Sequence, residues 1–233
     1  MNTQLKAIHT HALDFWYARG SVVVIVGLQL LIINKLTLGP RWLAPVLECA
    51  LLVPLSFATA WTQSLARGAT TEHHWLSVRR RRLAVRGLAL ALTVLITIMN
   101  FASLLYLVKA LLGGHAKSSG QSLLLDAINI WGTNVIAFAL WYWNIDRGGP
   151  ASQGITTAEE DDFLFPQMTL RDCKDWTPGF TDYLYLSFTN ASAFSPTDTM
   201  PLSERAKLLM MTESAISLLT LALVAARAVN ILN

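Results

Sequence analysis

The chain alternates between long apolar runs and short polar segments over most of its 233 residues. Four runs hold few charged residues and approach the ~20 residues that a helix needs to cross a bilayer. They cover Gly20–Asn34, Gly87–Val108, Ser122–Asn144 and Leu208–Ala226. A fifth run, Trp42–Trp61, is interrupted by Glu48 and two prolines, but the tryptophans at its ends have bilayer spacing and indicate a kinked span. The pattern predicts an all-α polytopic membrane protein with five transmembrane helices.

Composition agrees with this fold class. Hydrophobic residues make up 53% of the chain, charged residues only 14%, and the mean hydropathy is +0.43. Soluble domains carry about 25% charged residues, so the soluble class is excluded. The net charge of +3 does not predict a nucleic-acid partner, because the basic residues gather in segments that flank the apolar runs. Membrane lipids are the expected surroundings.

Polar segments divide the chain into four regions. We expect an interfacial N-terminal helix, a four-helix transmembrane region, a polar acidic loop, and a pore-like loop with the final span, at residues 1–19, 20–145, 146–180 and 181–233. The N-terminal region lacks a signal-peptide cleavage pattern. A polar loop is also expected at 66–86. Glycines and prolines in 146–180 exclude a long element there.

Basic residues predict the orientation of the chain. With five spans, the N-terminus and the loops after the second and fourth spans share one side, which holds 13 of the 18 Lys and Arg residues. The positive-inside rule puts this side in the cytoplasm. The amphiphilic segment Tyr185–Pro201, which directly precedes the last span, would then enter the membrane from inside.

This segment has the character of a pore loop. Thr181–Asn190 predicts a short half-helix whose apolar side chains pack outward, namely Tyr183, Leu184, Leu186 and Phe188. Asn190–Asp198 is rich in Asn, Ser and Thr and is expected to be extended. Non-helical backbone at membrane depth must face protein or water, so we expect this stretch to line a wet cavity. The half-helix is therefore predicted to be re-entrant.

Five residue types in this segment match the pore loop of the potassium-channel superfamily of tetrameric cation channels: Tyr185, Ser187, Phe188, Asp198 and Pro201. The next helix is also similar, with a basic pair at Arg205 and Lys207, and Glu213 one turn before Ser217, where those channels often have a hinge glycine. The resemblance covers about residues 180–230. It implies a homotetramer that conducts inorganic cations.

The overall layout also resembles an uncharacterised family of bacterial inner-membrane proteins. Its members share paired spans, an Arg-rich loop, an aromatic fourth span like ALWYWNIDRGG and a closing D-Y-x-Y-x-S-F segment. This resemblance covers most of the chain. It implies the bacterial inner membrane and no established activity.

The chain departs from the potassium pattern at the filter itself. The five filter positions hold Ala193, Phe194, Ser195, Pro196 and Thr197. A carbonyl-lined filter needs glycine at positive φ, whereas proline fixes φ near −65° and no glycine lies between Phe180 and Pro201. Selection by side chains remains, with Phe194 as an apolar gate and a ring of Asp198 in the oligomer. The other predicted lining residues are Thr189, Asn190, Ser192, Ser195 and Thr197.

The sequence therefore predicts an oligomeric, weakly selective cation pore. The alternative is a non-conducting membrane scaffold or assembly protein, in which Thr181–Pro201 is an interfacial cap. An enzyme is not expected. The H-x4-D spacing of His9 and Asp14 stands alone, and His73-His74 lacks metal-binding partners. No catalytic site, metal or cofactor is predicted. The contiguous arginines do not repeat along an apolar helix, so no voltage sensor is predicted either.

Charged residues elsewhere have two interpretations each. Glu48, Asp126 and Glu213 lie within apolar runs, where they could line a cation or proton path. Alternatively, Asp126 and Glu213 sit near helix ends and reach the interface or pair with a basic neighbour. The run Glu159–Asp162 gathers cations at a vestibule or is a solvated loop. The arginines bind anionic lipid headgroups or act only as a topology signal. They are Arg79, Arg80, Arg81 and Arg82.

Overall fold

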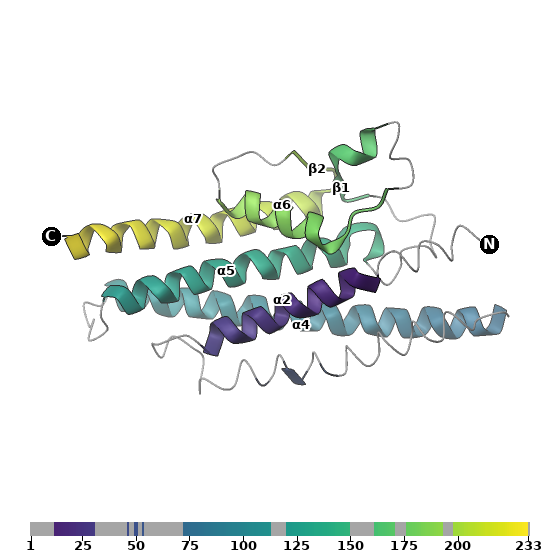
Figure 1. Ribbon diagram of the computed structural model, residues 1–233, viewed down its shortest axis with the longest axis horizontal. Helices are drawn as coiled ribbons and strands as arrows, with labels where there is room; N and C mark the ends of the chain where they lie inside the picture. Colours follow the sequence, from purple (N-terminus) through teal and green to yellow (C-terminus); the bar gives the residue numbers. More distant parts are fainter. Residues whose placement is uncertain are drawn as a thin grey trace.

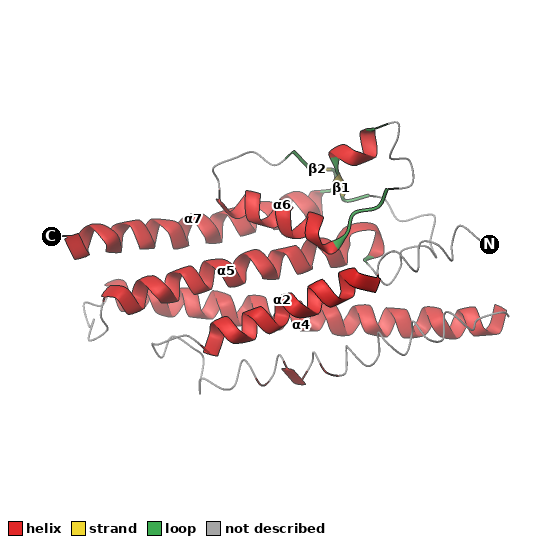
Figure 2. Cartoon of the chain, in the orientation of Figure 1, coloured by secondary structure: helices red, strands yellow, loops and turns green. Residues whose placement is uncertain are grey.

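The computed structural model describes residues 12–30, 46, 49–50, 53, 72–112, 120–149, 161–170, 176–192 and 198–232. Regular structure in these residues is almost entirely helical (Figure 2). Four helices are long: α2 (Ala12–Leu30), α4 (Glu72–Leu112), α5 (Gly120–Ile145) and α7 (Glu204–Leu232). The fifth, α6 (Phe180–Ser192), has only 13 residues.

Three helices are long and apolar enough to cross a membrane, over Ala84–Leu111, Ser122–Ile145 and Glu204–Ala226. The helical nature of three predicted apolar runs is thus confirmed, as expected for a multi-pass membrane protein. Trp16–Leu30 forms a shorter apolar helix. Helix α2 runs without a break from Ala12 across the expected boundary at residues 19 and 20. The predicted span Trp42–Trp61 lies almost wholly outside the described residues.

Helix α4 begins at Glu72, so the predicted polar loop over 66–86 is wrong from residue 72 onward. Residues 72–86 contain neither Gly nor Pro, and their Arg, Leu and Ala residues are strong helix formers. With 41 residues, α4 is about 60 Å long, twice the thickness of a bilayer core. Its N-terminal part extends beyond the neighbouring helices (Figure 1) and contains positions Arg79–Arg82.

Helix α5 is the centre of the bundle and packs against α2, α4, α6 and α7 (Figure 1). Of its span, 67% is buried, compared with 28% for α7. The reason is the aromatic C-terminal half of α5, where Phe138, Tyr142 and Trp143 belong to the main apolar core. The ring of Tyr142 meets Phe163 edge-on at a centroid distance of 5.2 Å, which joins α5 to the loop that follows it.

Helices α6 and α7 begin at the same end of the bundle, which we call the aspartate end because Asp146 and Asp162 lie there. Asp146 follows α5 directly and contacts Tyr183 in the first turn of α6. Asp162 contacts Arg205 in the first turn of α7. At the other end of α6, the Asn190 amide donates to a backbone carbonyl two turns into α7. Therefore α6 and α7 run in the same direction, opposite to α5.

A two-stranded sheet brings the chain back to the aspartate end after α6. Strand β1 (Phe163–Leu164) pairs antiparallel with β2 (Met200–Pro201), and Leu164 lies opposite Met200. Strand β2 immediately precedes α7. The chain thus leaves the aspartate end in α6 and has returned to it by Met200. The 3-10 helix η2 (Pro166–Thr169) follows β1 on the same side.

A tight turn ends α5 and turns the chain toward β1. It consists of the 3-10 helix η1 (Asp146–Gly148), in which Arg147 has φ 51°, followed by Gly149 with φ 77°. A Cβ at Gly149 would lie 2.7 Å from the Asn144 carbonyl oxygen, so only glycine fits. This turn fixes where the Asp146 carboxylate points.

A short helix, α6, covers the predicted segment Thr181–Asn190, but its faces are partly reversed. Tyr183 and Leu186 are buried in the bundle, so the prediction that they pack outward is wrong, whereas Phe188 is half exposed. The reason is the spacing of the inner face: Phe180, Tyr183, Leu186 and Ser187 recur every three or four residues and all are buried.

Candidate functional site

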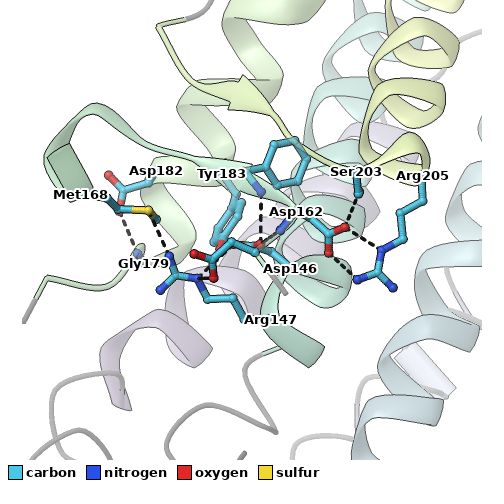
Figure 3. Close-up of polar contacts among 11 residues, drawn as sticks. Asp146, Arg147, Asp162, Met168, Gly179, Asp182, Tyr183, Ser203 and Arg205 are labelled. Atoms are coloured by element: carbon cyan, nitrogen blue, oxygen red, sulfur yellow. Dashed lines mark hydrogen bonds and ion pairs between the residues drawn. The ribbon is translucent and has the colours of Figure 1, made fainter. Parts of the chain in front are cut away.

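At the aspartate end, Asp162 joins the loop after α5 to the start of α7 (Figure 3). Its side chain is 1% exposed, and the Arg205 guanidinium donates to both carboxylate oxygens at 2.6 Å. The Ser203 hydroxyl donates to the same carboxylate, and the Leu202 N–H donates to the Asp162 carbonyl at 2.8 Å. A two-bond Arg–carboxylate contact is strong and directional. This cluster therefore fixes the point at which α7 begins.

Asp146 joins the same loop to α5 and α6. Its buried carboxylate accepts the Asp162 N–H at 2.7 Å, the Phe163 N–H at 3.3 Å and the Tyr183 hydroxyl at 2.5 Å (Figure 3). Burial raises the pKa of Asp146, while the Tyr183 and Asp162 hydrogen bonds oppose that rise. Burial and the neighbouring Asp146 raise the pKa of Tyr183 well above its ordinary value, so this phenol remains a donor.

The raised pKa of Asp146 predicts a pH effect on stability. A carboxyl that binds its proton more tightly in the folded state stabilises the fold at low pH, and this contribution is lost as the pH rises from the ordinary pKa of 3.8 through the folded value. Each unit of elevation corresponds to about 1.4 kcal/mol. Unfolding of the wild type and Asp146→Asn, followed from pH 3 to 8, should show the wild type losing stability relative to the variant. A relative gain with rising pH would contradict this.

Deeper in the bundle, the Glu213 carboxyl joins α7 to α5 and α6. Glu213 has no exposed surface. Oxygen Oε2 accepts the Tyr142 hydroxyl at 2.5 Å and the Asn190 amide at 2.6 Å, and Oε1 contacts the Ser187 hydroxyl. These three partners come from two different helices and are all polar. We call Glu213, Tyr142, Ser187 and Asn190 the Glu213 cluster.

Further bonds extend this cluster along the helices. The Ser187 hydroxyl lies 2.6 Å from the Val135 carbonyl oxygen on α5, and the Ser214 hydroxyl donates to the Asn190 side-chain oxygen at 3.1 Å. One turn beyond Glu213, Ser217 accepts the Asn134 amide at 3.0 Å. The interface of α5, α6 and α7 therefore contains a continuous set of polar contacts between apolar layers.

The contacts of Asp146 at the aspartate end and the Glu213 cluster are connected through α5 and α6. Tyr142 lies in the last turn of α5 and Asp146 follows four residues later, directly after that helix, while Tyr183 and Ser187 are four apart on one face of α6. Tyr183 bonds to Asp146, while Ser187 contacts Glu213. A shift of α6 along α5 would thus disturb both carboxyl groups together.

The predicted lining residues have different surroundings. The Thr189 hydroxyl donates to backbone carbonyls of its own helix, and Asn190 belongs to the Glu213 cluster. The half-buried Ser192 bonds to the Thr189 carbonyl. Asp198 is exposed. The five filter positions from Ala193 to Thr197 lie outside the described residues.

The predicted acidic residues also differ in their surroundings. Of the intramembrane acids, Glu48 lies outside the described residues, whereas Asp126 and Glu213 are both buried. Asp126 lies about 24 Å along α5 from Tyr142, so it is not part of the Glu213 cluster. Asp162 of the acidic run is buried in an ion pair, which corrects both earlier interpretations for this residue. Asp161 is 45% exposed and lies 2.8 Å from Arg147.

The sequence alone did not identify several residues that bond to Asp146 or Glu213, nor Asp146 itself, as site residues. Tyr142, Asp146 and Tyr183 have buried polar atoms that only the packing of distant segments reveals. The available signal was the four-residue spacing of Tyr142 and Asp146 in the aromatic span. No group of three or more His, Cys, Asp or Glu residues suited to a metal ion occurs in the part of the chain that the structure describes. Comparison with known proteins finds no matching family model, curated protein or solved structure.

Proposed function

We propose that this protein is an oligomeric, multi-pass membrane pore that conducts inorganic cations across the bacterial inner membrane. One observation carries the proposal: α6 enters the bundle from the aspartate end, and the chain is back at that end where β2 pairs with β1 before α7 begins. With 13 residues, α6 is about 20 Å long and too short to cross a bilayer. This arrangement supports a re-entrant half-helix.

The direction of α6 suits a positive ion. Its N-terminal turn is at the aspartate end and its C-terminal turn is at the depth of Glu213. The C-terminal end of a helix carries a partial negative charge of about half an elementary unit, which attracts cations. Basic residues at the aspartate end favour a cytoplasmic position for that end of the bundle.

Fewer residues are proposed to line the pore than the sequence alone predicted. Thr189 and Asn190 have partners within the chain, so their side chains are not offered as ion ligands. The exposed Asp198 and the hydroxyls between Ser192 and Asp198 remain. In a homotetramer, four Asp198 carboxylates would attract cations at the mouth.

One face of α7 provides the surface for assembly. Its exposed residues recur every three or four positions, and two of them, Ala215 and Ala222, are small. The exposed face consists of Leu208, Met211, Ala215, Leu218 and Ala222. Small residues let membrane helices approach closely. A tetramer with α7 around the axis would bring these faces together.

Asp198→Asn tests the lining role. Removing a ring of charges is expected to reduce cation-over-chloride selectivity in planar bilayers by on the order of tenfold, because the local cation concentration falls. Glu204→Gln is the matched control, since Glu204 is an exposed carboxylate at the start of α7. Its currents should match the wild type. Unchanged selectivity in Asp198→Asn would remove Asp198 from the pore.

A non-conducting scaffold is the second candidate. It is favoured by the hydrogen bonds of the Asn190 amide to Met210 and Glu213 on α7. These bonds hold α6 against its own chain, so Asn190 does not line a central axis. Under this alternative the purified protein carries no current at any membrane potential, while the Glu213 cluster still holds the fold together.

A further inference from the structure

The hydrogen atoms in the Glu213 cluster can be counted. The Tyr142 hydroxyl and the Asn190 amide both donate to Oε2. Ser187 has one hydroxyl hydrogen and two acceptors in contact with its oxygen, the Val135 carbonyl and Glu213 Oε1. If Ser187 donates to Val135, the contact with Oε1 needs a hydrogen from the carboxyl itself. A neutral Glu213, with its proton on Oε1, satisfies every group.

Among the residues that the structure describes, no cation forms an ion pair with Glu213. Tyr142 is the titratable side chain in contact from α5, and α6 contributes the uncharged Ser187 and Asn190. The charged groups nearest along these helices lie toward the aspartate end: Asp146 and Arg147 just after α5, Asp182 on α6, and Arg205 and the exposed Lys207 on α7. A buried carboxylate without a counter-ion is costly, so this site favours the neutral acid.

We propose that Glu213 is a proton-binding site, and that its proton holds α6 in place between α5 and α7. When the proton leaves, it passes to water and a single negative charge stays on the carboxylate. Ser187 must then turn its hydrogen from the Val135 carbonyl to Oε1. Both events weaken the attachment of α6. If α6 is the pore half-helix, proton release regulates conduction; only this consequence rests on the proposed function.

Hydrogen exchange of the full chain in lipid nanodiscs tests the linkage. Opening of α6 exposes Glu213 to water and releases one proton, so the protection factors of amides 180–192 should fall by about tenfold per pH unit. This fall should end at the pH where Glu213 loses its proton in the closed protein as well. Glu213→Gln imitates the neutral acid, since its amide donates to Ser187 and its carbonyl accepts from Tyr142 and Asn190. Asp146 also bonds to α6 through Tyr183, so both proteins are compared in the Asp146→Asn background. There the protection factors of Glu213→Gln should not change with pH, and the same flat profile in the protein that keeps Glu213 would overturn the proposal.

Infrared difference spectroscopy of the same samples supplies a second readout that needs no Glu213 variant. At neutral pH the wild type should have a protonated-carboxyl C=O band. This band should shift to higher wavenumber in Tyr142→Phe, because the carbonyl loses one donor. A spectrum without a band that responds to Tyr142→Phe would refute the proton site. A protein with this band but no current would refute the proposed pore and leave the proton site intact.

Discussion

Glu213→Ala is expected to destabilise the protein by about 3 kcal/mol. The substitution leaves the Tyr142 hydroxyl and the Asn190 amide without their common acceptor inside the bundle, and it removes the contact of the Ser187 hydroxyl with Oε1. Each unmet donor costs about 1–3 kcal/mol in a buried site, although polar contacts between membrane helices average nearer 0.6 kcal/mol. The free energy of unfolding in mixed detergent micelles measures this change.

Comparing the loss of stability among three variants shows whether the Glu213 side chain acts through hydrogen bonds or only through packing. Glu213→Gln keeps an acceptor for two donors and a donor for Ser187, so it should stay within about 1 kcal/mol of the wild type. Glu204→Ala removes an exposed carboxylate from the same helix and should change stability by less than about 0.5 kcal/mol. Equal losses in Glu213→Ala and Glu213→Gln would mean that the cluster does not depend on hydrogen bonding.

Arg205→Ala is expected to cost about 2–3 kcal/mol, because it leaves the buried Asp162 carboxylate without its cation. Removing one partner of a fully buried pair costs about 3–5 kcal/mol, and the 56% exposure of Arg205 reduces that value. Lys207→Ala is the control, because Lys207 is an exposed cation in the same turn of α7. Thermal unfolding in detergent reports both.

A double substitution identifies the cause of that loss. Asp162→Asn in the Arg205→Ala background removes the uncompensated charge and should recover part of the stability. If the double variant is less stable than Arg205→Ala by the full cost of Asp162→Asn alone, the two side chains are independent and the ion pair does not fix the start of α7.

Hydrophobic pattern was sufficient to predict the main helices. Ser122–Asn144 and Leu208–Ala226 are long apolar runs, and a run of that length in a chain with few charges favours a spanning helix whatever surrounds it. The existence of α6 followed from its local sequence as well. Its inner face did not, because Tyr183 and Leu186 are apolar enough to face either lipid or protein, and only the neighbouring α5 decides between them.

The polar clusters depend on contacts between distant residues. Glu213 was identified as an intramembrane acid, but its partner Tyr142 precedes it by 71 residues and lies on a helix of different direction. Asp162 was grouped with its acidic neighbours because sequence alone does not reveal that Arg205 would reach it. A single sequence contains periodicity and local turn chemistry; the choice of partner arises from packing.

A reversal-potential measurement in planar bilayers shows whether the purified protein conducts cations. Under a tenfold gradient of potassium chloride, the wild-type protein should carry current with a reversal potential near the potassium equilibrium value. Currents that reverse near zero or near the chloride value, or no current from a protein that retains its fold, would exclude a cation-selective pore.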